Sequence, residues 1–368
     1  MITLRRASGW CAVGLVGLAL LLQGCGTVAT RKVPAPSYRG VLPAVDAVQF
    51  VTPKIGFIAG QGIVLTTDDG GVKWTRIYNG RETIRAIDFI GKFNGWVLTA
   101  SGSVLAWNGG PKWQRVASAL GRAAAMHLAA GGAGLIVTAR GMLYRAGRPG
   151  GPWQREGLQG VSALSFSASQ TGWAVTISGT TAPQVWRTRD GGKTWTLSFT
   201  PQLGQPQGWT PTLASSGDAA WLLLTSAQGQ LEHQPYVAFA TTDLGMQWQE
   251  ALSAPLFVSQ GMYPGAPASL YGLQAGPVAV SGQSGYFLSW APATPNDILA
   301  LTVTRDGGQT WRQIPLQKVQ PSETPDFFEP LGMALGGSTT LWLVGSRNGR
   351  GRVLVSHDGG VHWSAPAL

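Results

Sequence analysis

The sequence predicts an all-β protein, a seven-bladed β-propeller made of four-stranded antiparallel blades. A tryptophan recurs seven times, at positions 74, 113, 153, 195, 248, 311 and 363, and its spacing of about 40 to 60 residues is close to the length of one propeller blade. Short β-rich runs separated by Gly, Pro or Asp lead up to these tryptophans. No long window after residue 40 has the i, i+3, i+4, i+7 apolar spacing of an amphipathic helix.

The first 24 residues have the organisation of a secretory signal peptide. Two arginines precede an apolar run that ends at Leu22, and this run is shorter than the roughly 20 apolar residues that a membrane-spanning helix needs. The letters LQGC at positions 22–25 resemble the lipobox of bacterial lipoproteins. The resemblance implies cleavage after residue 24 and attachment of a diacylglycerol to Cys25. A plain secretory signal and an uncleaved anchor are the alternatives.

Cysteine content restricts the chemistry of the mature chain. Cys11 lies in the predicted signal peptide, and acylation would consume Cys25, the second of the two cysteines. A disulfide scaffold, a thiolate nucleophile and a cysteine-ligated metal are therefore not expected. Residues 25–40 are rich in small, proline and basic residues, which predicts a lipidated flexible spacer before a propeller at residues 41–368.

The composition indicates a folded domain with a basic surface. The chain is 44% hydrophobic and 12% charged, which is the opposite of a disordered composition. Its net charge of +10 favours partners such as anionic lipid headgroups, a cell-wall polymer or an acidic protein face. Nucleic acid is not an expected partner, because the leader predicts export.

Each recurring tryptophan ends a Ser/Thr-x-Asp-x-Gly-x-x-Trp pattern, which is complete in five copies and eroded in two. The Gly permits the positive φ of a tight turn, the Asp accepts hydrogen bonds from the N–H groups of that turn, and the Trp buries a large ring. We therefore predict that each complete copy stabilises its own hairpin, and that its aspartate is structural and not catalytic. The predicted structural residues are Asp69 and Trp74, Asp190 and Trp195, Asp243 and Trp248, Asp306 and Trp311, and Asp358 and Trp363. The eroded copies, AWNGGPKW and AGRPGGPW, end at Trp113 and Trp153.

This pattern resembles the Asp-box, or BNR repeat, of sialidases, some glucanases, sortilin-type receptors and photosystem II assembly factors. The order of segments within a blade is most similar to that of the Ycf48/Hcf136-like propellers. The segments that carry the likeness are VQF at 48–50, GFIAG at 56–60 and TTDDGG at 66–71, with GWV at 95–97 and GWA at 172–174 as later copies of the second strand. The resemblance implies a seven-bladed propeller that acts as a non-enzymatic assembly or scaffold factor for membrane-protein intermediates.

Three consecutive repeats carry a Trp-x-Arg motif, which predicts a cationic stripe. Residues two apart lie on the same face of a strand, so the arginines recur at one position around the ring. The candidate partner-binding residues are Arg76, Arg115 and Arg155, with the adjacent Lys73 and Lys112. Further positive charge in the same half of the chain comes from Arg81, Arg85, Arg122, Arg140 and Arg145. A purely solubilising role for these cations is the alternative.

A glycoside hydrolase of sialidase or glucanase type is the main competing class. Such an enzyme needs two carboxyl groups facing each other across the sugar, and the Arg-Ile-Pro motif of sialidases is absent from the sequence. The most acidic cluster outside the boxes, Glu323, Asp326 and Glu329, lies in a proline-rich stretch typical of a solvated loop. No catalytic residue, metal site or cofactor is predicted, since the neighbouring His357 and His362 flank a structural box.

We therefore expect a monomeric, exported protein, held by its lipid on the extracytoplasmic side of the cell membrane or outer membrane. Its expected function is that of a non-enzymatic scaffold or assembly factor, which binds an acidic face of a membrane or envelope protein through the propeller surface. A sialidase/glucanase-type enzyme and a polysaccharide-binding module that takes a glycan are the alternatives. Closure of the ring stays open, because the last blade could take all its strands from the C-terminal end or one from residues 40–46.

Overall fold

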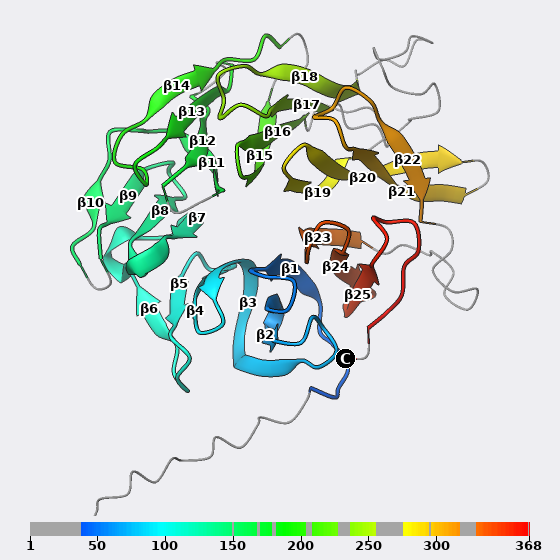
Figure 1. The fold of residues 1–368 in the computed structure, drawn as a ribbon. Coiled ribbons are helices and arrows are strands. Elements are labelled where there is room, and N and C mark those ends of the chain that lie inside the picture. The colour runs from blue at the N-terminus through cyan, green and yellow to red at the C-terminus, as the bar shows by residue number, and fades with distance from the viewer. Residues whose placement is uncertain are drawn as a thin grey trace, which may run out of the picture. The chain divides into compact units, whose positions relative to one another are not determined.

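The computed structural model describes residues 38–148, 151–167, 170–178, 182–203, 208–226, 236–254, 275–293, 296–316, 329–366 and 368. The predicted signal peptide, Cys25 and nearly all of the predicted spacer lie outside these residues. The described residues belong to one compact unit, Pro36–Leu368, and they form β-strands with two short 3-10 helices (Figure 1). The predicted all-β class is confirmed. None of the helices within the described ranges has the length and apolar content needed to span a membrane.

The strands pair with their neighbours in antiparallel sheets. The first sheet contains β1 (Val45–Phe50), β2 (Gly56–Thr67), β3 (Thr75–Gly91), β4 (Asn94–Thr99), β5 (Val104–Trp107) and β6 (Gln114–Val116). The second contains β7 (Ala123–Leu128), β8 (Gly134–Thr138), β9 (Leu143–Ala146) and β10 (Gln154–Arg155), and the 3-10 helices η1 (Ser118–Leu120) and η2 (Ala130–Gly132) flank β7 in the chain. The third contains β11 (Val161–Phe166), β12 (Gly172–Thr176), β13 (Gln184–Thr188) and β14 (Thr196–Phe199).

The remaining sheets continue this order. The fourth contains β15 (Trp209–Ser216), β16 (Ala219–Ser226), β17 (Tyr236–Thr241) and β18 (Gln249–Ala254). The fifth contains β19 (Ala275–Ser281), β20 (Ser284–Ala293), β21 (Asn296–Thr304) and β22 (Arg312–Pro315). The last contains β23 (Glu329–Leu335), β24 (Leu341–Arg347) and β25 (Arg350–Ser356).

The prediction of seven four-stranded blades is wrong, because the described strands form six sheets. The first sheet has six strands, the next four have four strands each, and the last has three. β3 runs unbroken for 17 residues, in which residues 75–83 pair with β2 and residues 84–91 pair with β4. The repeat units of Trp74 and Trp113 therefore share one blade, since main-chain pairing continues from one unit into the next.

The first strand of each sheet lies nearest the centre of the unit. These first strands contact one another in the order β7, β11, β15, β19, β23, and β23 then contacts β1. The second half of β3 completes the circuit between β1 and β7 (Figure 1). The second strands β8 and β12 are buried along their whole length. Their sequences GLIVT and GWAVT are correspondingly apolar on both faces, as expected for strands covered on both sides.

Both ends of the described chain close the ring at β25. The N–H of Gly351 donates to the carbonyl of Leu42 at 2.8 Å, and Pro43 forms a bridge with Arg350. Farther along β25, Val355 and Ser364 exchange two backbone hydrogen bonds of 2.8 and 2.9 Å. The sequence left open which strands complete the last blade. The last sheet has three strands of its own, and residues 42–43 and Ser364 form short bridges along its edge strand β25.

The turns of the complete boxes pack against the preceding sheet. Gly71 has a φ of +94°, and a Cβ atom there would lie 2.2 Å from Cη2 of Trp342, so this position requires glycine. Trp342 also meets Trp74 edge to face at a centroid distance of 5.7 Å. Both indoles are 1% exposed. This contact joins the last sheet to the first and makes the first box part of the ring closure.

Candidate functional site

The five complete boxes share one local hydrogen-bond pattern. In each, the Thr or Ser hydroxyl donates to Oδ1 of the Asp at 2.7–2.8 Å and accepts the N–H of the box Gly at 2.8–3.0 Å. The same Oδ1 accepts a further N–H from the turn, as from Lys73 to Asp69 at 2.9 Å. The hydroxyl-bearing residues are at most 3% exposed. Each carboxylate is therefore engaged within its own turn, and the five lie in five different turns.

Hydrogen bonding lowers the pKa of the box carboxyls. For Asp306, the hydroxyl of Thr310, its N–H and the hydroxyl of Thr304 lower the pKa to about 2. For Asp190, burial raises the pKa, but the hydrogen bonds from Thr194 and the rest of the turn outweigh burial and lower the pKa to about 2. Carboxyl groups with such low pKa values are poor general acids or bases near neutral pH.

The predicted cations lie on three strands, β3, β6 and β10, and in the turns before the first two of these. Arg76 lies in β3, Arg115 in β6 and Arg155 in β10, and all three side chains are exposed. Lys73 and Lys112 lie in the turns that precede β3 and β6 and are also exposed. The structure brings Arg115 together with Arg122, at a cavity between the first and second sheets.

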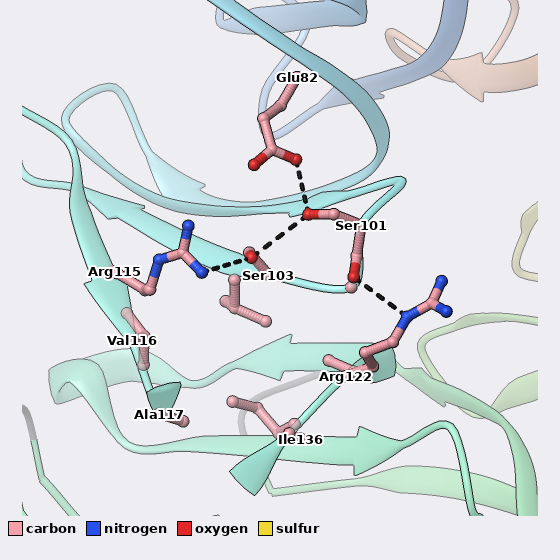
Figure 2. A pocket seen from close by; sticks show the side chains of 12 residues that line it. Glu82, Ser101, Ser103, Arg115, Val116, Ala117, Arg122 and Ile136 are labelled. Carbon is pink, nitrogen blue, oxygen red and sulfur yellow. Dashed lines mark hydrogen bonds between the residues drawn. The ribbon is translucent and has the colours of Figure 1, made fainter. Parts of the chain in front are cut away.

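This cavity, which we call the arginine pocket, has a volume of about 370 Å³ (Figure 2). Its polar lining comes from several elements: Glu82 lies in β3, and Ser101 and Ser103 lie in the turn between β4 and β5. Arg115 lies in β6, and Arg122 immediately precedes β7. The apolar part of its lining is formed by Val104, Val116, Ala117, Ala123 and Ile136.

A chain of hydrogen bonds orients the polar groups of the arginine pocket. Ser101 Oγ donates to Oε2 of Glu82 at 2.6 Å and lies 3.3 Å from Ser103 Oγ. Arg115 donates from Nη1 to Ser103 Oγ at 2.8 Å, and Arg122 donates from Nε to the carbonyl of Ser101 at 3.1 Å (Figure 2). The other N–H groups of both guanidinium groups find no acceptor among the described residues, so they are available to a ligand.

Two guanidinium groups and one carboxylate give the described lining of this pocket a net positive charge. Burial raises the pKa of Tyr78, and the negative charge of the neighbouring Glu82 raises it further. A guanidinium group binds a carboxylate through two parallel N–H···O bonds, so the pocket suits an anionic ligand. The described lining offers Glu82 but no second carboxyl group of the kind a glycosidase places across the sugar.

The other sequence candidates are not assembled into a site. Glu323 and Asp326 lie outside the described residues, and the side chain of Glu329, the first residue of β23, does too. His362 binds the box carboxylate of Asp358 through Nδ1 at 2.6 Å, and His357 lies 3.5 Å from the Thr340 hydroxyl. In the part of the chain that the structure describes, no three His, Cys, Asp or Glu side chains are placed to hold a metal ion.

The sequence pointed to Arg115 but missed the pocket around it. Glu82, Ser101 and Ser103 have no motif of their own, and Glu82 is separated from Arg115 by more than one strand of the sheet. Their proximity depends on the unbroken course of β3 from β2 to β4, which places Glu82 at the junction of the two pairings.

No known protein-family model matches the sequence, and none of the curated proteins does. The fold is shared with solved structures. A YCF48 protein solved with a bound D1 peptide is 18% identical, with a TM-score of 0.55, and the match covers 87% of this chain and 98% of that one. YCF48 from Cyanidioschyzon merolae is 14% identical, with a TM-score of 0.52 and coverage of 87% and 97%.

An enzyme shares the fold as well. The GH74 xyloglucanase from Xanthomonas campestris is 16% identical, with a TM-score of 0.63. The match covers 90% of this chain but 56% of the xyloglucanase chain. At these identities the comparisons show a β-propeller fold.

Proposed function

We propose that this protein is a non-enzymatic scaffold or assembly factor, anchored to a membrane through a lipid on Cys25, that binds an acidic segment of a membrane or envelope protein. The arginine pocket is the binding site in this proposal. The observation that carries it is the pair of guanidinium groups of Arg115 and Arg122, each held by one hydrogen bond to the serine turn and each with N–H donors to spare. An acidic side chain is the natural ligand of such donors.

Three further observations support a protein partner outside the cytoplasm. The YCF48 propeller of similar fold was solved with a D1 peptide, which favours a peptide as ligand. The net charge of +10 and the exposed Arg76 on β3 and Arg155 on β10 favour an acidic partner surface. The signal-like leader and the LQGC letters at positions 22–25 favour export and lipidation.

Charge reversal of both arginines tests the proposed site. We expect the full-length variant Arg115→Glu/Arg122→Glu to recover at least about tenfold less of the co-purifying membrane protein from detergent-solubilised membranes of the native host. Both side chains are exposed, so the unfolding midpoint should change little. The matched control is Arg189→Glu, which reverses an exposed arginine in the box turn of the third sheet and should keep the partner.

Other outcomes separate the competing functions. Full recovery of the partner by the double variant, or no partner with the wild type, contradicts the proposed site. Retention of the Cys25→Ser variant in the membrane fraction contradicts the lipid anchor. Release of sugar from xyloglucan or a sialoside by the purified wild type shows an enzyme in place of a scaffold.

A further inference from the structure

A second and larger cavity, of about 650 Å³, lies between the first and second sheets. We call it the eroded-box groove. The end of the first sheet, β4 to β6, forms one wall, and η2, the end of β9 and Trp153 form the other. Arg115, Val116 and Ala117, which Figure 2 labels in the arginine pocket, line both cavities. The groove is thus a neighbour of the proposed binding site.

The two eroded boxes face each other across this groove. The complete pattern has Thr or Ser seven residues before the Trp and Asp five residues before it; the first eroded copy has Ala106 and Asn108 at these positions. The second has Ala146 and Arg148. All four of these residues line the groove. The substituted positions of both eroded copies therefore lie in the lining of the groove.

The complete boxes pack their turns against the preceding sheet. Their buried hydroxyl ties the turn together, and the box Gly is pressed against the preceding sheet, as Gly245 is against Trp173 and Gly308 against Trp221. Trp96 follows Gly95 as Trp173 follows Gly172, and its ring packs against Gly134 of β8, where a Cβ atom would lie 2.2 Å from Cη2. Trp221 packs in the same way against Gly285 of β20. Trp96 also lines the groove.

In the second eroded copy polar groups lack a described hydrogen-bond partner, whereas in the first the indole N–H of Trp113 donates to the carbonyl of Ile77 at 2.9 Å. In four complete boxes the indole N–H donates to the carbonyl of the box Gly at 2.9–3.1 Å. The indole N–H of Trp153 donates to none of the described residues. The guanidinium group of Arg148 is exposed, and no described side chain accepts a hydrogen bond from it. Both groups can therefore bind a ligand without breaking an existing contact.

The lining defines the chemistry of that ligand. Trp96, Val116 and Leu128 give the groove an apolar floor, and Arg115 and Arg148 supply two positive charges. Aspartate and glutamate are absent from its described lining. A mostly apolar cavity with a few polar groups at its edge binds a ligand with an apolar body, and the arginines require that it carry a negative charge.

We propose that the eroded-box groove binds an extended peptide segment that inserts an aromatic or aliphatic side chain into the floor and places a neighbouring carboxylate on Arg148. This rests on the proposed function, because it takes the segment to belong to the protein partner. The apolar floor favours a peptide side chain over a glycan, whose hydroxyl groups would lose hydrogen bonds to water there. The shared residues 115–117 let one segment reach both cavities.

Restoring a complete box tests this proposal without removing any packing residue. The full-length variant Ala146→Thr/Arg148→Asp regenerates the whole pattern together with Gly150 and Trp153. We expect its unfolding midpoint to match or exceed that of the wild type, because five sister boxes already fold with these residues. The probe is a library of acetylated nonapeptides in which one Phe or Trp is flanked by Asp and Glu, measured by fluorescence anisotropy. Affinity of the best binder should fall at least about tenfold in the variant.

The controls distinguish this proposal from the proposed function. The same peptides with Lys in place of Asp and Glu should bind the wild type at least about tenfold more weakly. Three results would each overturn the groove proposal: unchanged affinity in the box-restored variant, equal binding of acidic and basic peptides, or no peptide binding by the wild type. A fourth outcome would overturn the groove proposal and leave the proposed function standing. In it, the Arg115→Glu/Arg122→Glu variant loses the native partner, while the box-restored variant captures it fully. A β-glucan oligosaccharide that binds the wild type and is lost on restoration would assign the groove to a glycan.

Discussion

The five complete boxes and the two eroded ones occupy equivalent turns of the repeat, yet the eroded ones supply residues to the eroded-box groove and the complete ones do not. A complete box has a hydroxyl and a carboxylate that hydrogen-bond within the turn and a glycine that packs against the preceding sheet, as at Thr67, Asp69 and Gly71. An eroded box has alanine in place of the hydroxyl residue and Asn108 or Arg148 in place of the aspartate, and the eroded-box groove lies there.

The comparison shows that the propeller fold is kept where the motif is incomplete. Each box stabilises its own turn through bonds within a few residues, so losing one does not undo the others. The two eroded copies are consecutive in the sequence, and their turns therefore line the same inter-sheet space.

The largest expected difference between the two kinds of box is in the tryptophan. Trp74 is 1% exposed and meets Trp342 across the ring closure, so Trp74→Ala should lower the free energy of unfolding by about 3–5 kcal/mol. Trp153 is only partly buried and lies in the eroded-box groove, so Trp153→Ala should cost less than about 2 kcal/mol. Urea unfolding followed by circular dichroism measures both.

The two substitutions serve as controls for one another, since each removes the same indole from an equivalent turn. Equal losses would show that the eroded box holds its turn as firmly as a complete one. The groove would then have no connection with the loss of the pattern.

A smaller difference is expected in acid. The folded-state pKa of Asp306, about 2, lies below the value of about 3.9 expected in the unfolded chain. Its contribution to stability is therefore fully present above about pH 4 and is lost as the pH falls through 2. The variant Asp306→Asn should be less stable than the wild type by about 1 kcal/mol at pH 7, and this gap should shrink between pH 4 and pH 2. Urea unfolding at several pH values measures the gap.

The eroded copy provides the comparison for this experiment. Asn108→Ala changes the same position of the pattern without removing an ionisable group, so the gap between this variant and the wild type should not vary with pH. A gap for Asp306→Asn that is constant down to pH 2 would show that its carboxylate does not stabilise the turn by accepting hydrogen bonds in the charged state.

The sequence by itself determined the features of the fold that depend on residues close together in the chain. The all-β class follows from short strand patterns, and the complete turns follow from a hydroxyl, a carboxylate and a glycine that bond within five residues of one another, as from Ser356 to Gly360. The same local pattern located the eroded copies, although it could not show that their alanines face a common cavity. The Trp-x-Arg motif also predicted a strand at Arg115, which lies in β6.

The tertiary structure alone decided the number of sheets, the composition of the arginine pocket and the closure of the ring, because these depend on pairing between residues distant in the chain. The predicted seven blades became six sheets because β3 continues from one pairing partner to the next, which no local signal in residues 75–91 specifies. The same continuity places Glu82 beside Ser101. Ring closure at β25 joins Leu42 to Gly351 across nearly the whole chain. Such contacts arise from packing the repeats into a closed ring, so the residues that make them carry no pattern of their own.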